Sequence, residues 1–155
     1  MNLDTHGLDR FVEAQDRVYR TVCDELRAGR KQSHWMWFVF PQLAGLGRSA
    51  IARHFGFASE QEVQHYWQRP VLQGRLLECT RLVMAHRGDS AHAIFGSPDD
   101  LKFRSCMTLF QAVVPAAAAP EAEVFGQAIE AFFGGSPDEA TLRLLRACAG
   151  SADAC

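Results

Sequence analysis

A succession of amphipathic segments, separated by glycine and proline, limits the fold of this chain more than any other feature. From Leu8 to Leu26, apolar residues recur at steps of three and four while charged residues fill the opposite face, which predicts an amphipathic helix. Gly29 follows it as a natural C-terminal stop. No two segments alternate apolar and polar residues as paired strands would. The periodicity therefore predicts an all-α protein.

Capping signals mark where the later helices begin. Ser59 and Glu62 form a Ser-x-x-Glu capping box, and Pro70 suits the first position of the next helix. Ser-Pro-Asp at residues 97–99 and again at 136–138 supplies a cap and a proline start. After the first helix, further helices are expected at residues 49–55, 60–69, 70–87, 101–114, 121–133 and 139–149. We predict a compact orthogonal bundle of about seven helices.

The chain length and composition predict one globular domain. With 155 residues, 48% of them apolar, we expect a flexible N-terminal arm at 1–7, a helical domain at 8–149 and a flexible tail at 150–155. The N-terminus lacks a signal-peptide pattern, and no apolar run is long enough to span a membrane. The five cysteines have no metal-ligand spacing, so we predict free thiols and a cytoplasmic location.

Residues 29–46 combine positive charge with bulky apolar side chains as no other stretch does. Arg30, Lys31 and His34 precede the apolar run WMWFVF at residues 35–40. That run is too short to cross a bilayer and too bulky to remain in water. It is either a short helix ended by Pro41 or a short strand, and it is buried or half-buried with a polar edge facing a ligand.

A second segment, LKFRSCMTLF, offers polar groups that could face this run. On a helix, Asp100, Arg104 and Thr108 share one face. The two segments together would provide cations, stacking rings and hydrogen-bonding groups suited to a small anionic aromatic ligand, such as a nucleotide or an ADP-ribose-like molecule. The candidate ligand-binding residues are Lys31, His34, Trp35, Trp37, Gln42, Arg104, Ser105 and Thr108.

The alternative interpretation is a protein-interaction or structural domain in which the tryptophans form the core or an interface, and Asp100 and Arg104 form a surface bridge. His34 is the best acid–base candidate, but the pattern identifies no reaction. No metal and no cofactor are expected. The net charge of −2 argues against nucleic acid as the partner, and the sequence predicts no oligomeric state.

Three blocks, GRKQSHWMWFVFPQLAGLG, RPVLQGRLLECT and IFGSPDDLKFRSCMTLF, resemble a bacterial family catalogued as domain of unknown function 1810. The resemblance implies a small, cytoplasmic, single-domain protein with no established activity. Some members carry the label calpastatin, a disordered inhibitor, which this composition does not fit. The tryptophan run and the Lys-x-Arg-x-x-Met helix are also similar in style to the NADAR family of ADP-ribose N-glycosidases, although no catalytic residue carries over.

Overall fold

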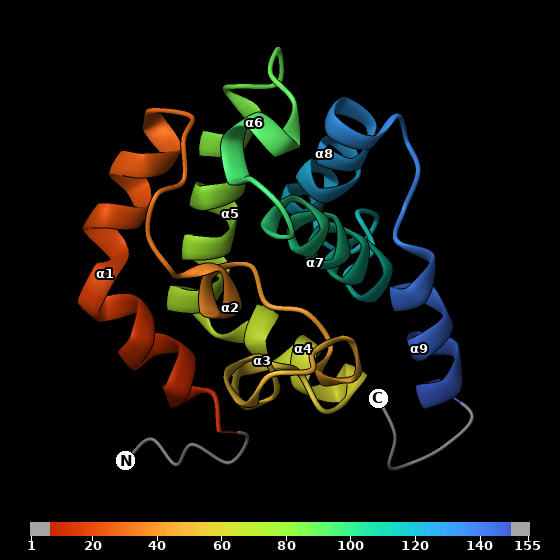
Figure 1. The fold of residues 1–155 in the computed structure, drawn as a ribbon. Helices are drawn as coiled ribbons and strands as arrows, with labels where there is room; N and C mark the ends of the chain where they lie inside the picture. Colours follow the sequence, from red (N-terminus) through yellow and green to blue (C-terminus); the bar gives the residue numbers. More distant parts are fainter. Residues whose placement is uncertain (1–6, 150–155) are drawn as a thin grey trace.

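The computed structural model describes residues 7–149, and within this range the chain is all-α (Figure 1). The described part contains nine α-helices and two short 3₁₀-helices, so the predicted class is confirmed and the predicted count of seven is too low. Its extended pairing is confined to an isolated parallel bridge between Leu43 and Phe57. The tail predicted at 150–155, and the predicted arm apart from Gly7, lie outside the described residues.

The helices follow one another with short connections. The α-helices are α1 (Asp9–Arg27), α2 (Met36–Val39), α3 (Ala50–Phe55), α4 (Glu60–Gln68), α5 (Pro70–Met84), α6 (Ala91–Phe95), α7 (Asp99–Val113), α8 (Glu123–Phe133) and α9 (Glu139–Ala149). The 3₁₀-helices are η1 (Ala44–Leu46) and η2 (Pro120–Ala122).

Two of these helices were not fixed by the periodicity. The apolar run forms the single helical turn α2, which resolves the choice between helix and strand. The short helix α6 was not predicted, because its five residues are too few to show a helical period. Ser90 caps it by accepting a hydrogen bond from the backbone N–H of Ala93 at 3.0 Å.

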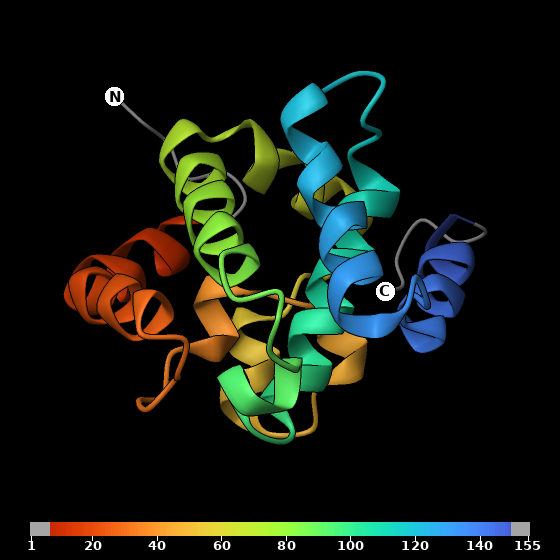
Figure 2. The ribbon, with the colours of Figure 1, turned by 90° about the horizontal axis from the view of Figure 1, so that it is seen from above.

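The longer helices pack in the order α1, α5, α8, α7 and α9, so sequence neighbours are often not neighbours in space. Figure 2 shows α1 at one side, α5 and α8 in the middle and α9 at the other side. The helices α2, α3 and α4 lie together near one end of the bundle in Figure 1, and α6 lies near the other. This arrangement places α7 in the interior.

Aromatic packing joins the apolar run to α7. Phe40, at the end of the run, makes edge-to-face contacts with Phe103 of α7 and Phe95 of α6, with centroid distances of 5.1 and 5.8 Å. Phe103 and Phe110 are completely buried along α7. The two segments that stand out in the sequence therefore lie against each other, and most of the apolar run belongs to the core.

Candidate functional site

Glu25, near the end of α1, shapes the chain that leads into α2. Its carboxylate accepts hydrogen bonds from the backbone N–H groups of Gln32 at 2.8 Å and Ser33 at 3.0 Å, and from Trp35 Nε1 at 2.9 Å. The Ser33 hydroxyl donates to the same carboxylate. Ser33 does not cap α2, because the residue at the start of α2 is Trp35 and the Ser33 side chain turns back to Glu25.

These hydrogen bonds change the acidity of Glu25. Partial burial by itself would raise the pKa of the carboxyl, but the donors on Ser33, Gln32 and Trp35 outweigh it and lower the pKa from 4.5 to about 2. Glu25 is therefore a stable anion that holds residues 32–35 in one conformation. This loop forms one wall of a pocket.

The pocket lies between this loop and the beginning of α7. It has a volume of about 270 Å³. It is lined by Lys31, His34, Met36, Trp37, Ser97, Pro98, Asp99 and Lys102. Three of the eight candidate residues, Lys31, His34 and Trp37, thus lie in one cavity.

One carboxylate holds two ammonium groups at this pocket. Asp99 Oδ2 lies 2.8 Å from Lys31 Nζ, and Asp99 Oδ1 lies 3.6 Å from Lys102 Nζ. Lys31 Nζ also donates to the backbone carbonyl of Ser33 at 2.6 Å. Since one acid faces two cations, the group carries a net positive charge, and the first turn of α7 adds the positive end of its helix dipole.

The two tryptophans of the apolar run differ in their surroundings. Trp35 is 1% exposed and packs against Phe40 in the core, whereas Trp37 is half-buried and lines the pocket. Lys102 Nζ lies 5.2 Å from the centroid of the Trp37 ring, within the range of a cation–π contact. Of these two rings, Trp37 is the one placed to contact a ligand.

Arg104, Ser105 and Thr108 lie outside this pocket and hold the start of α9. Arg104 Nε donates to the backbone carbonyl of Ser136 at 2.9 Å. Thr108 Oγ1 accepts from the backbone N–H of Asp138 at 2.8 Å, and Ser105 Oγ donates to the Asp138 carboxylate at 3.2 Å. Their hydrogen bonds connect α7 to α9.

Asp138 is also the cap of α9, with its carboxylate accepting from the backbone N–H of Thr141 at 3.0 Å. The sequence instead suggested Ser136 for that role.

Asp100 and Arg104 do not pair with each other. Asp100 Oδ2 lies 3.5 Å from His92 Nδ1, while the Arg104 guanidinium donates to Ser136. Gln42 contributes a backbone carbonyl that accepts from the N–H of Phe57 at 3.0 Å, beside the η1 segment.

Asp99 and Lys102 are the charged pocket residues that were not among the candidates drawn from the sequence. Asp99 lies at the helix start predicted from residues 97–99, where an acid is favourable, and Lys102 lies two residues before Arg104, a spacing that directs their side chains apart on a helix. Both expectations are compatible with the structure, because Lys102 and Arg104 do point in different directions. The signal that could have identified the pair is their spacing of three residues, which places an acid and a base on one helix face.

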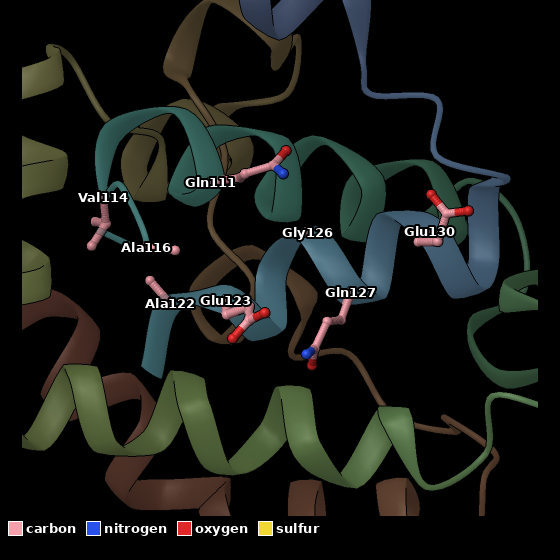
Figure 3. A pocket seen from close by; sticks show the side chains of 8 residues that line it. All are labelled: Gln111, Val114, Ala116, Ala122, Glu123, Gly126, Gln127 and Glu130. Carbon is pink, nitrogen blue, oxygen red and sulfur yellow. The ribbon is translucent and has the colours of Figure 1, made fainter. Parts of the chain in front are cut away.

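Two other pockets differ from the pocket at Lys31 in the residues that line them. One, of about 310 Å³, lies between α7 and α8 and is bordered by Gln111, Gly126, Glu123 and Glu130 (Figure 3). Another, of about 430 Å³, lies beside the end of α5 and is bordered by both arginines and glutamates. Neither places a cation beside an aromatic ring among its lining residues, so the pocket at Lys31 is the stronger candidate for an anionic aromatic ligand.

Residues 7–149 contain no group of three or more His, Cys, Asp or Glu side chains suited to holding a metal ion. None of the described helices has the length and hydropathy that a membrane span requires.

The fold and this site define a compact all-α protein with a small basic and aromatic pocket. The chain belongs to the family described as protein of unknown function (DUF1810), whose profile matches residues 5–145. It is similar to a solved structure, the conserved hypothetical protein Rv1873 from Mycobacterium tuberculosis, with 50% sequence identity and a TM-score of 0.85. That similarity covers 92% of this chain and 99% of the other, and no curated protein matched the chain. The resemblance seen in the sequence is confirmed.

Proposed function

We propose that this protein binds a small anionic ligand with an aromatic group, such as a nucleotide or an ADP-ribose-like molecule, in the pocket between residues 31–37 and the start of α7. The observation that carries the proposal is the placement of two ammonium groups, held by Asp99, beside the half-buried ring of Trp37.

The lysines supply the anion-binding part of the site. Each ammonium group has three donor hydrogens, and Lys31 directs two interactions to Asp99 and the Ser33 carbonyl. The Lys31 ammonium also lies 5.1 Å from the centroid of the Trp35 ring, so Lys102, whose side chain is 23% exposed, is the ammonium group more open to a phosphate oxygen. Because Asp99 offsets one of the two positive charges, the site favours a ligand with few negative charges over a polyanion.

Trp37 supplies the aromatic part of the site. Its ring is half-buried and lines the pocket, and the Lys102 ammonium lies 5.2 Å from the ring centroid, so the pocket offers a cation and an aromatic ring together. A cavity of about 270 Å³ is slightly smaller than the range of ligand pockets, roughly 300–1,000 Å³. We therefore expect the phosphate end of a nucleotide to enter the cavity and the base to lie on Trp37 at its rim.

His34 is exposed at the same rim and is the group available for acid–base chemistry if the ligand is a substrate. The proposed role of the pocket is therefore ligand binding. The free thiols of Cys23, Cys79 and Cys106 support the expected cytoplasmic location.

A thermal-shift screen with AMP, ADP, NAD and ADP-ribose tests the proposal. A ligand with a Kd of about 10 μM, present at about 1 mM, should contribute roughly 2.7 kcal/mol to stability. That contribution corresponds to an increase in Tm of roughly 5–10 °C for a protein of this size.

The substitution Lys102→Met should reduce the increase in Tm, because it removes an ammonium group from the pocket. The matched control is Arg53→Met, which removes an exposed positive charge on α3 and should leave the increase intact. The absence of stabilisation by all four compounds in the wild-type protein would count against the proposal.

A further inference from the structure

Two cysteines meet where α1 packs against α5, the two helices that lie side by side in Figures 1 and 2. Cys23 belongs to α1 and Cys79 to α5, and both thiols lie against the same hydrogen-bonded pair of side chains, Tyr19 and Glu78. Cys79 is completely buried, whereas Cys23 retains 5% exposure. The pair lies in a different part of the molecule from the pocket of Lys31.

Polar groups surround this pair on the side that faces solvent. The Tyr19 hydroxyl lies 3.9 Å from Cys79 Sγ, and a Glu78 carboxylate oxygen lies 3.7 Å from Cys23 Sγ. The Tyr19 hydroxyl also donates to Glu78, and the Arg75 guanidinium lies over the Tyr19 ring at 4.8 Å. Tyr19 is half-buried and Glu78 is exposed, so the thiols lie beside polar side chains that reach the solvent.

Cys106 provides a contrast within the same chain. It is completely buried in α7, and this burial raises the pKa of its thiol well above 9. At Cys23 the interaction with the Cys79 thiol outweighs burial and, with a contribution from Tyr19, lowers the pKa of the thiol, while the pKa of Cys79 is raised. The nearby Glu78 carboxylate opposes this change and Arg27 assists it. A lowered pKa increases the fraction of thiolate, which is the reactive form.

We infer that Cys23 and Cys79 form a peroxide-sensitive dithiol, which small hydroperoxides oxidise to a reversible intramolecular disulfide between α1 and α5. Three observations carry the inference: the thiols lie on two helices that pack against each other, both lie against the pair of Tyr19 and Glu78, and Cys23 retains some exposure.

The oxidation proceeds in two steps. The Cys23 thiolate attacks the terminal oxygen of the peroxide, the O–O bond breaks, and the departing alkoxide or hydroxide takes a proton from water, leaving a sulfenic acid on Cys23. The Cys79 sulfur then attacks the Cys23 sulfur, the S–O bond breaks, and hydroxide leaves with the Cys79 proton as water. In total the two thiols lose two electrons and two protons, and the peroxide is reduced to water and an alcohol, or to two waters.

Peptide mapping tests this inference in a full-length background in which Cys148 and Cys155 are replaced by serine. The protein is exposed to increasing concentrations of hydrogen peroxide, unfolded, alkylated and digested with trypsin. Cleavage after arginine places Cys23 in the peptide 21–27, Cys79 in 76–81 and Cys106 in 105–143. We expect a linked product of the first two peptides, lighter than their sum by two hydrogen atoms and abolished by dithiothreitol.

Cys106 acts as the internal control in each sample. The link should form at least about tenfold faster than any modification of Cys106, since thiolate content and access both favour Cys23. In the Cys79→Ala variant, dimedone should label Cys23 as a sulfenic acid and no link should form. The Cys23→Ala variant should give neither product, and circular dichroism melts show whether each variant is folded.

Two results would overturn the inference. One is equal alkylation of Cys23, Cys79 and Cys106 in the folded, peroxide-treated protein, with no linked peptide. The other is direct conversion of Cys23 to a sulfinic acid while Cys79 remains alkylated, because that would show that Cys79 does not resolve the sulfenic acid.

Discussion

Lys31 and Asp99 form an ion pair, with Nζ 2.8 Å from Oδ2, that joins the loop before α2 to the start of α7. Their side chains are only 7% and 20% exposed. Both line the pocket, and Lys102 approaches the second oxygen of the same carboxylate. The pair therefore connects two segments that are distant in sequence and fixes the positive charge on which the proposed binding depends.

Replacing Lys31 by methionine should affect stability and binding together. The change leaves Asp99 with only its weaker contact to Lys102, and we expect a loss of about 1–3 kcal/mol in the free energy of unfolding, less than for a fully buried pair. Affinity for AMP should fall at least tenfold. Urea unfolding and calorimetric titration measure the two effects. The neighbouring Arg30→Met variant, which removes an exposed charge, is the matched control; equal effects of both variants would show that only overall charge matters.

Asp99→Asn should separate stability from affinity. The amide keeps the shape of the side chain but removes a negative charge close to the expected phosphate position. By Coulomb's law in water, the repulsion between the Asp99 carboxylate and a phosphate charge at 4 Å is about 1 kcal/mol. Removing this repulsion should raise the affinity for an anionic ligand roughly fivefold, and by a smaller factor at high salt. The free energy of unfolding should fall because both lysines lose their counter-ion. Weaker AMP binding by a folded variant would contradict our view of Asp99 as a competitor of the ligand.

Glu25 should make stability depend on pH in the acid range. Its pKa is lowered from 4.5 to about 2 in the folded protein, so its contribution is complete above pH 4.5 and is lost as the pH falls towards 2. Because Glu25 is only partly buried, we reduce the expected contribution to about 1–2 kcal/mol.

Urea unfolding of wild type and Glu25→Gln at pH 6 and at pH 3 measures this contribution. The difference between the two proteins should be largest at pH 6 and smaller at pH 3. Glu13→Gln, which changes an exposed acid on α1, should show no comparable effect. A difference for Glu25→Gln that stays constant with pH would indicate lost packing and would rule out the electrostatic explanation.

Asp138→Ala should destabilise the protein without changing ligand affinity. Asp138 caps α9 and accepts a hydrogen bond from Ser105, and loss of a helix cap costs about 0.5–2 kcal/mol. Thermal denaturation measures this loss, and calorimetry at a temperature where the variant is folded measures affinity. A tenfold loss of AMP affinity in the folded variant would mean that the residues at the start of α9 take part in binding.

Sequence periodicity was enough to find the long helices, but it did not identify the short helices α2 and α6. α1 has 19 residues, and its apolar face repeats over five turns. α6 has five residues, of which Ala91, Ile94 and Phe95 are buried, so its pattern is indistinguishable from that of an apolar loop. Periodicity also failed at α2. Every residue of the run at 35–40 is apolar, so the pattern could not distinguish a helix from a strand.

The sequence also identified the two segments of the site but not the orientation of α7 about its axis. Successive residues of a helix point about 100° apart, so the face that meets the loop depends on tertiary packing. Burial of Phe103 and Phe110 turns Asp99 and Lys102 towards Trp37 and turns Arg104 towards α9. Because α7 is apolar or small on several faces, its sequence does not determine this rotation.

Calorimetric titration of AMP, adenosine and inorganic phosphate into the wild-type protein tests the central claim most directly. The account predicts that AMP binds with a Kd of about 10 μM or lower, more tightly than either fragment, and that Lys102→Met and Trp37→Ala each weaken it at least tenfold. Equal affinity for AMP and adenosine, or the absence of binding heat for AMP at several temperatures, would contradict it.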